Sequence, residues 1–307
     1  MAQKPLENRC DNLVDHFLGI DLESWALNPA FRHLTPMGRK QIDGGATPRQ
    51  IERFLDELRR ARQRVTWFVA SELFTWDPQM IRAIAQEGHE IAYHTHSHPE
   101  PITAEILEQE LANSGEFLAT FHPLGFRAPR LLMPSEAYPV LARAGFRYSS
   151  SIYGNAGRSF VQQGIVELPV SSAPYAGGAA EPQRHGLSMS FLCRQFPYGS
   201  GVSLGLMGGR GVAWWIRRQE RAHRRSNLFV HSWQQQPMPA AMRRAQWRMA
   251  ATNPLLFPYF RDVLSSLRYL LERFQFKPCR TVLADQPGPG LLNEITRGRG
   301  YNVRHSP

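Results

Sequence analysis

The chain has 307 residues, 42% of them hydrophobic, so it is long enough for one large globular domain with a substantial core. It contains no run of eighteen apolar residues, and its first ten residues lack the apolar segment of a signal peptide, so we expect a cytoplasmic protein. Cys10, Cys193 and Cys279 are widely spaced and form no Cys-x-x-Cys pair, which argues against both a disulfide framework and a cysteine zinc site.

The formal net charge of +10 raises the question of an anionic partner. Five arginines lie between positions 217 and 225, next to Trp214 and Trp215, and three more lie between 243 and 248. We expect a solvated basic face there. The alternative is a contact with lipid headgroups at the inner membrane or with a polysaccharide-assembly complex. No nucleic-acid-binding signature accompanies these arginines, so nucleic acid is not an expected partner.

Short apolar runs and amphipathic segments alternate along the first half of the chain. A helix is expected to begin with Thr47 as its N-cap and Pro48 as its first residue. Strands alternating with helices of ten or more residues indicate a parallel sheet built from βα units, either a barrel or a doubly wound sheet. The expected strands are 16–20, 64–70, 90–93, a strand end at 125–130 and 146–149, and the later helices are 77–88, 103–121 and 134–145.

The second half of the chain is less regular. Residues 153–210 are rich in glycine and proline and predict a loop-rich insertion with one clear strand at 165–170. The segments that follow predict helices at 214–225 and 260–274, a strand at 227–233 and an edge strand at 276–283. We therefore predict one catalytic domain over residues 1–285 and a disordered tail over 286–307.

Three histidines occupy the alternate positions 94, 96 and 98, directly after the expected strand 90–93. Because His94 and His98 are four residues apart, a helical turn there would bring both imidazoles within reach of one ion. His96 alternates away from its neighbours and is expected to be structural. A lone His-x3-His match is more often a pair of surface histidines, so the assignment depends on polar residues elsewhere.

Those polar residues lie at the ends of other expected strands. Asp21 and Glu23 follow the first strand, Arg127 lies in the strand end at 125–130, and His231 lies at the end of the strand at 227–233. Such strand ends meet at one edge of a parallel sheet, which favours a barrel. One carboxylate with two histidines forms a metal site that leaves positions open for water and substrate, and the ion would activate the water and polarise a carbonyl. A second carboxylate could accept the proton of the water, and a distant histidine could protonate the leaving group, so the pattern indicates a hydrolase of an amide or ester.

Five segments in this order resemble the motifs of the polysaccharide deacetylase family, the NodB-homology proteins of carbohydrate esterase family 4. The branch found with bacterial exopolysaccharide gene clusters is the most similar. The resemblance covers about residues 15–285 and implies a distorted (β/α) barrel. The five segments are 19–25, 94–98, 126–129, 148–152 and 228–233.

The resemblance implies a divalent metal ion, with zinc as the expected ion, and His94 and His98 as two of its ligands. Asp21 is implied as the catalytic base. Many family members have adjacent aspartates in the first motif, whereas here Leu22 holds the second place, so Glu23 becomes the expected third ligand. Which carboxylate holds the ion stays open at this point.

Arg127 is implied to orient the base, and His231 to act as general acid toward the departing amine. Two departures affect this second half of the site. Ser149 stands where the family usually has aspartate, and the last motif ends in Gln234 where the family has glutamate. Both changes indicate reduced or altered activity.

We expect substrate contacts from four further residues within these motifs. Aromatic faces suit the apolar faces of pyranose rings, although core packing explains a tryptophan equally well. The four expected contacts are Trp25, Pro129, Tyr148 and Trp233.

The sequence thus predicts a metal-dependent hydrolase that removes N-acetyl groups from amino-sugar units of a polysaccharide or lipid-linked glycan. One alternative is a hydrolase of other non-peptide C–N bonds, such as those of cyclic amides. The other is a catalytically silent glycan-binding or assembly protein whose basic surface docks on a membrane complex.

Overall fold

The computed structural model describes residues 14–178, 180, 182–184, 186–252 and 254–285. The tail from Gln286 that was expected to be disordered lies outside the described residues. Within them, Cys193 and Cys279 are free thiols. No helix in this part of the chain is long and apolar enough to cross a membrane.

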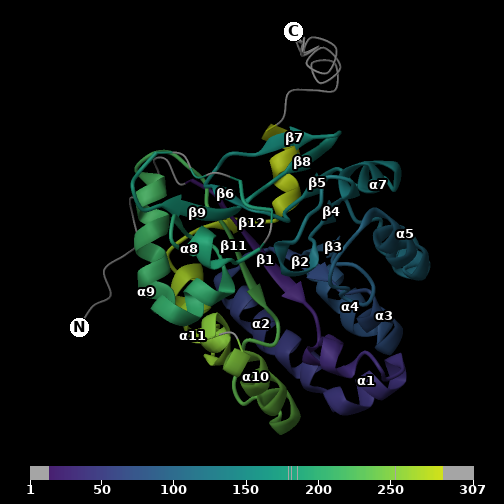
Figure 1. Cartoon of the computed structure of the whole chain (residues 1–307). Helices are drawn as coiled ribbons and strands as arrows, with labels where there is room; N and C mark the ends of the chain where they lie inside the picture. The colour runs from purple at the N-terminus through teal and green to yellow at the C-terminus, as the bar shows by residue number, and fades with distance from the viewer. Residues whose placement is uncertain (1–13, 179, 181, 185, 253, 286–307) are drawn as a thin grey trace.

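Nine strands of the described chain form one curled sheet, which is parallel except for the pairing of β7 with β8. Every residue of the central strand β1 is buried, as expected for a strand covered on both faces. The predicted distorted (β/α) barrel is therefore confirmed (Figure 1). The strand order is β11 (Asn227–His231), β1 (His16–Leu22), β2 (Thr66–Val69), β3 (Glu90–Tyr93), β4 (Gly125–Phe126), β5 (Tyr148–Ser149), β8 (Ile165–Glu167) and β7 (Phe160–Gln162), with β12 (Phe276–Lys277) paired to β1.

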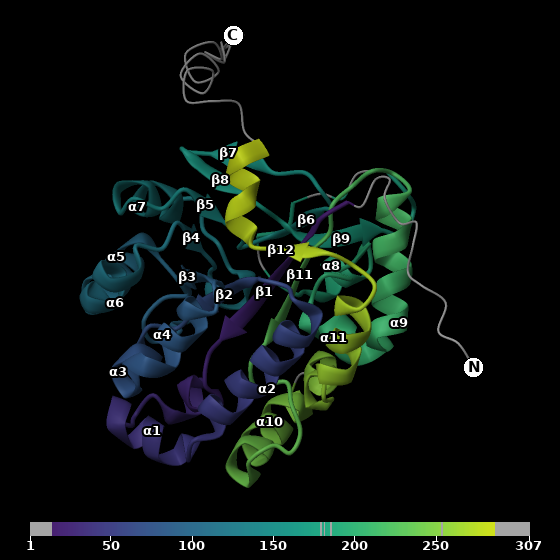
Figure 2. The same ribbon diagram turned by 180° about the vertical axis from the view of Figure 1, so that it is seen from behind.

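Helices follow the strands as the alternating pattern predicts, and α2, α4 and α11 lie together on one face of the sheet (Figure 2). The α-helices of this barrel are α1 (Pro36–Asp43), α2 (Ala46–Ala61), α3 (Glu72–Trp76), α4 (Pro78–Gln86), α5 (Ala104–Asn113), α6 (Gly115–Phe121), α7 (Ala137–Arg143), α9 (Gly201–Glu220), α10 (Ala240–Thr252) and α11 (Leu264–Leu271). The 3-10 helices are η1 (Trp25–Leu27), η2 (Pro29–Phe31), η3 (Pro129–Leu131), η4 (Pro254–Phe260) and η5 (Cys279–Asp285).

The start of α2 differs from the prediction. Gly45, in the left-handed conformation with φ 72°, is the N-cap, and Thr47 lies inside the helix. The hydroxyl of Thr47 donates to Asp43 Oδ1 at 2.6 Å and its N–H donates to Oδ2 at 3.0 Å. The prediction of Thr47 as the cap was therefore wrong. Pro48 remains tolerated, because the first turn of a helix leaves its N–H groups without intrahelical partners.

The single helix expected over 103–121 is two helices, α5 and α6, separated at Ser114. The Ser114 hydroxyl donates to the carbonyl of Glu110 at 2.7 Å and also lies 2.9 Å from the hydroxyl of Tyr93. Bonding of a serine to the preceding turn competes with the regular helix, so a buried serine at this position explains the break.

The region 153–210 contains more regular structure than predicted. The strand expected at 165–170 divides into β8 and β9 (Val170–Pro174), with Pro169, which has no N–H to donate to a ladder, between them. A second sheet contains β6 (Tyr153–Asn155), β9 and β10 (Gln195–Phe196), and α8 (Met189–Leu192) lies beside it.

The end of the expected loop region, residues 201–210, is the first half of α9. Gly208, with φ 67°, kinks this helix, and two of its other glycines allow close packing. A Cβ atom at Gly205 would lie 2.1 Å from the carbonyl oxygen of Pro258 in η4, and one at Gly209 would lie 2.6 Å from that of Ser266 in α11. The helix expected over 214–225 ends at Glu220, and the edge strand expected at 276–283 is β12 followed by η5.

We expect Gly205→Ala to lower the free energy of unfolding by about 1–3 kcal/mol, because the new methyl group overlaps a backbone oxygen that cannot move alone. Urea unfolding followed by circular dichroism measures the change. Gly115→Ala is the matched control, because Gly115 is also helical and no neighbouring segment lies within 4 Å of the Cβ that alanine would add. Equal stability of the two variants would contradict the role assigned to Gly205.

Candidate active site

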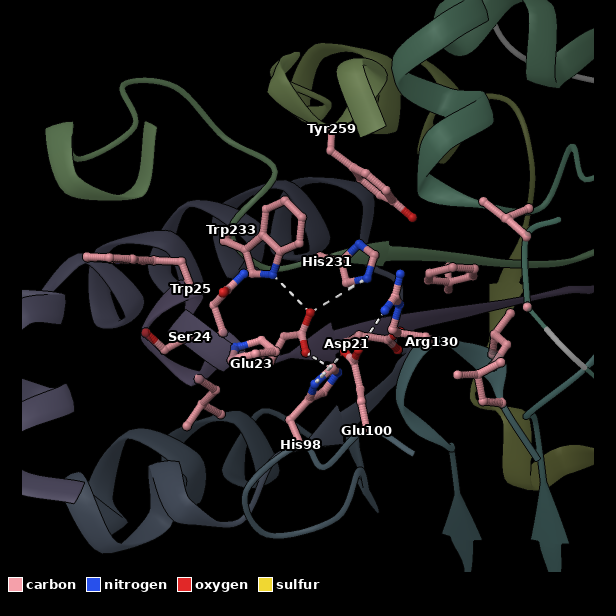
Figure 3. A pocket seen from close by; sticks show the side chains of 18 of the residues that line it. Asp21, Glu23, Ser24, Trp25, His98, Glu100, Arg130, His231, Trp233 and Tyr259 are labelled. Carbon is pink, nitrogen blue, oxygen red and sulfur yellow. Dashed lines mark hydrogen bonds and ion pairs between the residues drawn. The ribbon is translucent and has the colours of Figure 1, made fainter. Parts of the chain in front are cut away.

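A cavity of about 520 Å³ opens at the carboxyl ends of β1 and β11 (Figure 3). A polar strip along it contains Asp21, Glu23, His98 and His231. The other side chains that line it are mainly apolar and come from β6, β11, η1, η3, η4, α10 and the loops around them. They include Trp25, Leu131, Tyr153, Leu187, Phe229, Trp233, Met242, Tyr259 and Phe260.

Glu23, His94 and His98 form a group that can hold a metal ion. One ligand atom from each residue lies within 4.8 Å of the other two. Glu23 Oε2 lies 2.7 Å from His98 Nε2 and 3.9 Å from His94 Nε2. Two imidazoles and one carboxylate are the donor types of catalytic zinc sites, so the residues present fit a divalent ion.

The two histidines converge through a bend, not through the helical turn considered from sequence. Thr95 and His98 have φ values of 63° and 58°, in the left-handed region. The Thr95 hydroxyl accepts a hydrogen bond from the N–H of His98 at 3.2 Å. His96 turns away from the ligand set, with its Nδ1 3.0 Å from the hydroxyl of Ser71. The bend therefore brings together the outer two histidines only.

Glu110 holds this bend from α5. Its Oε2 accepts hydrogen bonds from the N–H groups of His96, at 2.7 Å, and Ser97, at 2.6 Å, and its Oε1 accepts one from the Ser97 hydroxyl at 2.8 Å. The carboxylate is buried, and bonds from several donors to one anion are strong. Glu110 was not among the residues expected from sequence. The available signal was an acidic residue on the buried side of α5, close to Leu107 and Ser114.

His94 has one ring nitrogen fixed by the backbone. Its Nδ1 lies 2.8 Å from the carbonyl oxygen of Arg127, so Nδ1 carries the proton and Nε2 is free to face Glu23. Burial lowers the pKa of His94 to about 4, although the carboxylates of Asp21 and Glu23 oppose this effect. His94 is therefore neutral at pH 7, which is the form that binds metals.

His98 and Glu23 form a charged pair. Burial alone would raise the pKa of the Glu23 carboxyl, but the imidazoles of His98, His231 and His94 together hold that pKa well below its usual value. Burial also opposes the charged form of His98, yet Glu23 and Glu100 raise the pKa of its imidazole above the usual value. A carboxylate and an imidazolium at 2.7 Å make a charge-assisted hydrogen bond.

Asp21 has a different cation. Arg127 is fully buried and donates from Nη1 to Asp21 Oδ1 at 2.6 Å. Its Nε and Nη2 donate to the carbonyl and hydroxyl oxygens of Ser150, each at 2.8 Å. The guanidinium lies 3.9 Å from the centre of the Phe68 ring. Asp21 is thus oriented by Arg127 and lies outside the group formed by Glu23 and the two histidines.

His231 ends β11 and points into the cavity. Its Nε2 lies 3.6 Å from Glu23 Oε1, and its ring stacks on Trp233 with centroids 4.7 Å apart. Gln234 Oε1 accepts the backbone N–H of His231 at 3.0 Å and lies 3.3 Å from its Nδ1. Ser149, in the place of the family aspartate, donates to Ser151 instead. The support of His231 therefore comes from an amide rather than from a carboxylate.

The predicted substrate-contact residues divide into two pairs. Trp25 and Trp233 line the cavity, and Trp233 Nε1 donates to Glu23 Oε1 at 3.0 Å. Tyr148 is fully buried on β5, where its hydroxyl donates to Glu90 at 3.0 Å, and Pro129 is buried as well. Neither Tyr148 nor Pro129 lines the cavity, and their contacts with a substrate stay a prediction. Tyr259 lines the cavity and was not expected from sequence.

The fold and this donor set define an α/β barrel protein with a site of the kind that binds catalytic metal ions. The family model for polysaccharide deacetylase matches residues 42–149, a segment that includes the histidine bend and Arg127 but not Asp21, Glu23 or His231. The resemblance of this chain to the polysaccharide deacetylase family is therefore confirmed.

Among curated proteins, a peptidoglycan-N-acetylglucosamine deacetylase of Bacillus cereus is 27% identical over 110 residues, which are 34% of this chain and 52% of that protein. A chitooligosaccharide deacetylase of Rhizobium leguminosarum bv. trifolii is 33% identical over 85 residues, which are 27% of this chain and 39% of that protein. The chain thus spans about half or less of the length of these relatives.

A solved structure from Mycobacterium smegmatis, assigned to the polysaccharide deacetylases, superposes with a TM-score of 0.50 at 20% sequence identity. The superposition covers 85% of this chain and 91% of that one. At this identity the similarity concerns the fold, and it extends well beyond the segment matched by the family model.

We expect Glu110→Gln to weaken zinc binding about 10- to 100-fold, because the amide nitrogen of glutamine cannot accept the hydrogen bonds that hold the bend. Competition with a chromophoric chelator measures the affinity. Glu108→Gln, an exposed position of the same helix, is the matched control and should bind zinc as the wild type does. If both variants bind zinc equally well, Glu110 does not position His98.

Proposed function

We propose that this chain is a metal-dependent deacetylase that removes N-acetyl groups from amino-sugar units of a polysaccharide or lipid-linked glycan. The observation that carries the proposal is that Asp21, Glu23, His98 and His231 line one cavity, with His94 beside Glu23 and Arg127 paired to Asp21 behind them. The names of the relatives, deacetylases of peptidoglycan N-acetylglucosamine and of chitooligosaccharides, support the choice of an N-acetylated glycan. The proposal includes the prediction that residues 1–285 form one catalytic domain.

Glu23, His94 and His98 would hold the divalent ion, for which zinc is our proposal. When bound, such an ion supplies Lewis acidity to the amide carbonyl and to the attacking water molecule. His94 offers Nε2 in its neutral form, and Glu23 offers an ionised carboxylate.

The reaction adds water to the acetyl carbonyl and then breaks the C–N bond. Asp21 lines the cavity and accepts a proton from the water as the new C–O bond forms. Arg127 keeps the carboxylate of Asp21 in place for this transfer. His231 donates a proton to the sugar nitrogen as the C–N bond breaks, which yields acetate and a free amine.

Aromatic side chains flank the reacting groups and suit a sugar ring. Trp25 and Trp233 lie on one side of the polar strip, and Tyr259 lies 5.1 Å from the ring of His231 between ring centres. Flat apolar faces of this kind pack against pyranose rings, and the polar strip between them reaches the N-acetyl group.

A basic and aromatic helix beside the cavity supports the proposed contact with a membrane surface or a polysaccharide-assembly complex. Met242 and Ala245 of α10 line the cavity, while Trp247 of the same helix is 54% exposed. Arg243, Arg244 and Arg248 are exposed along it. A positive face with an exposed tryptophan complements an anionic surface, and its place at the cavity would present a surface-bound glycan to the site.

Purified protein should release acetate from N-acetylated chitooligosaccharides, and chelation or His94→Ala should lower the rate by at least about 100-fold, because both remove the Lewis acid. His96→Ala is the matched control, since His96 lies outside the ligand group, and it should retain most of the activity. Acetate release that is unaffected by chelation and by His94→Ala would refute the proposed mechanism.

The same assays separate the rival functions. Turnover of a cyclic amide without turnover of N-acetylated sugars would replace the deacetylase proposal with a cyclic amidohydrolase. Saturable binding of an N-acetylated oligosaccharide without acetate release, in protein with full metal occupancy, would replace it with a glycan-binding protein.

Zinc binding should release about one proton per ion near pH 6, mainly from His98. The raised pKa of His98 keeps its imidazole protonated in metal-free protein at that pH, whereas His94, with a pKa of about 4, is already neutral. Zinc affinity should therefore fall as the pH decreases through the pKa of His98. Calorimetry in two buffers of different ionisation enthalpy counts the protons, and a proton count of zero at pH 6 would contradict the assigned charge of His98.

A further inference from the structure

A second cavity, of about 360 Å³, lies between the small sheet and the C-terminal end of α9. Asn155 and Ser172 from β6 and β9 line one side together with the loop containing Gly177 and Gly178. Residues of α9 and the following turn line the other side. The two cavities share no lining residue, so this one is separate from the proposed active site.

Three arginines from three different segments line this second cavity. Arg158 follows β6, Arg218 lies in the last turn of α9, and Arg224 lies in the turn after that helix. None of the three forms an ion pair with another described residue, and no aspartate or glutamate is among the lining residues. The neighbouring Arg225, by contrast, pairs with Asp285. Like charges that share a cavity repel one another, so an anion placed between them is favoured.

The aromatic residues beneath Arg218 hold its guanidinium in place. Trp215 lines the cavity and stacks on Phe196 and Tyr198, with 5.6 Å between ring centres in each pair. The guanidinium carbon of Arg218 lies 5.8 Å from the centre of the Trp215 ring and 5.7 Å from that of Trp214. Cation–π contacts of this kind limit the rotamers of an arginine and reduce the entropy lost when it binds an anion.

Gln219 adds a polar group at the same place. It lines the cavity with 8% of its surface exposed. Its side-chain amide can donate a hydrogen bond to a ligand oxygen in the cavity.

The helix dipole explains only part of this arrangement. Arginines near a helix C-terminus are favoured by the exposed carbonyl groups there, which accounts for Arg218 and Arg224. The helix dipole does not account for Arg158, which comes from a different segment. It also does not account for Gln219 or for the cavity that these residues line together.

We propose that this cavity is a second binding site, for a diphosphate group. Three guanidinium groups match a multiply charged phosphate chain better than the single charge of a carboxylate, and arginine binds phosphate oxygens in pairs. The volume leaves room for one group attached to the diphosphate. A nucleoside diphosphate and a lipid diphosphate share this chemistry.

Calorimetric titration of the full chain with inorganic pyrophosphate at constant ionic strength tests the site. We expect saturable binding that Arg218→Gln weakens about tenfold, as for the loss of one charge-assisted hydrogen bond. Arg221→Gln is the matched control, because Arg221 is an exposed neighbour of equal charge that does not line the cavity, and it should change the affinity less than about twofold. Arg158→Gln, on the other side of the cavity, should weaken binding as Arg218→Gln does, and it serves as the second variant if Arg218→Gln disturbs folding.

The same titration of His94→Ala separates this site from the proposed metal centre, and the affinity for pyrophosphate should be unchanged. Uridine diphosphate and geranyl diphosphate distinguish the two sources of a diphosphate, and tighter binding of either one supports the site. Absence of saturable binding, equal weakening by Arg218→Gln and Arg221→Gln, or loss of binding in His94→Ala would each overturn the proposal.

Discussion

The buried ion pair between Arg127 and Asp21 is the interaction on which the rest of the site depends. It joins β1 to the end of β4, and Ser150 ties the same guanidinium to the end of β5. The carbonyl of Arg127 also fixes the ring of His94. Gly19 leaves the room for this side chain, because a Cβ there would lie 2.5 Å from Arg127 Nη1. Removing the arginine would leave a buried carboxylate without its cation, which is among the costliest single changes in a protein interior.

The departures from the family motifs affect the opposite side of the cavity. Ser149 cannot charge-pair with His231, and it hydrogen-bonds with Ser151 instead. Gln234 takes over the orientation of His231 through its side-chain oxygen, and stacking on Trp233 restrains the ring. The side-chain amide of Gln234 can hold the imidazole of His231 in place. Being uncharged, it does not stabilise a protonated imidazole as a carboxylate would. Gln234 thus preserves the position of His231 without placing a negative charge beside it.

Much of the fold and of the site could be predicted from the sequence, because strands and strand-end residues are encoded locally. The runs that became β1, β2, β3 and β11 are apolar and short, and parallel strands place the residues after them at one edge. Features set by distant contacts could not be predicted. The bend at His98 depends on Glu110 from another element, the glycines of α9 depend on the approach of η4, and Tyr148 is drawn into the core by Glu90.

The balance of charge explains why Glu23, rather than Asp21, is the carboxylate that would bind a metal ion. Asp21 already has a permanent cation in Arg127, so an added ion would compete with an arginine that cannot leave its buried position. Glu23 is also buried, but its partners are imidazoles and the indole N–H of Trp233, and the positive charge beside it is the proton on His98. Exchanging that proton for a divalent ion keeps Glu23 paired and frees His98 Nε2 as a ligand. In the proposed function Asp21 would therefore be the base and Glu23 the metal ligand, because their neighbours supply different cations.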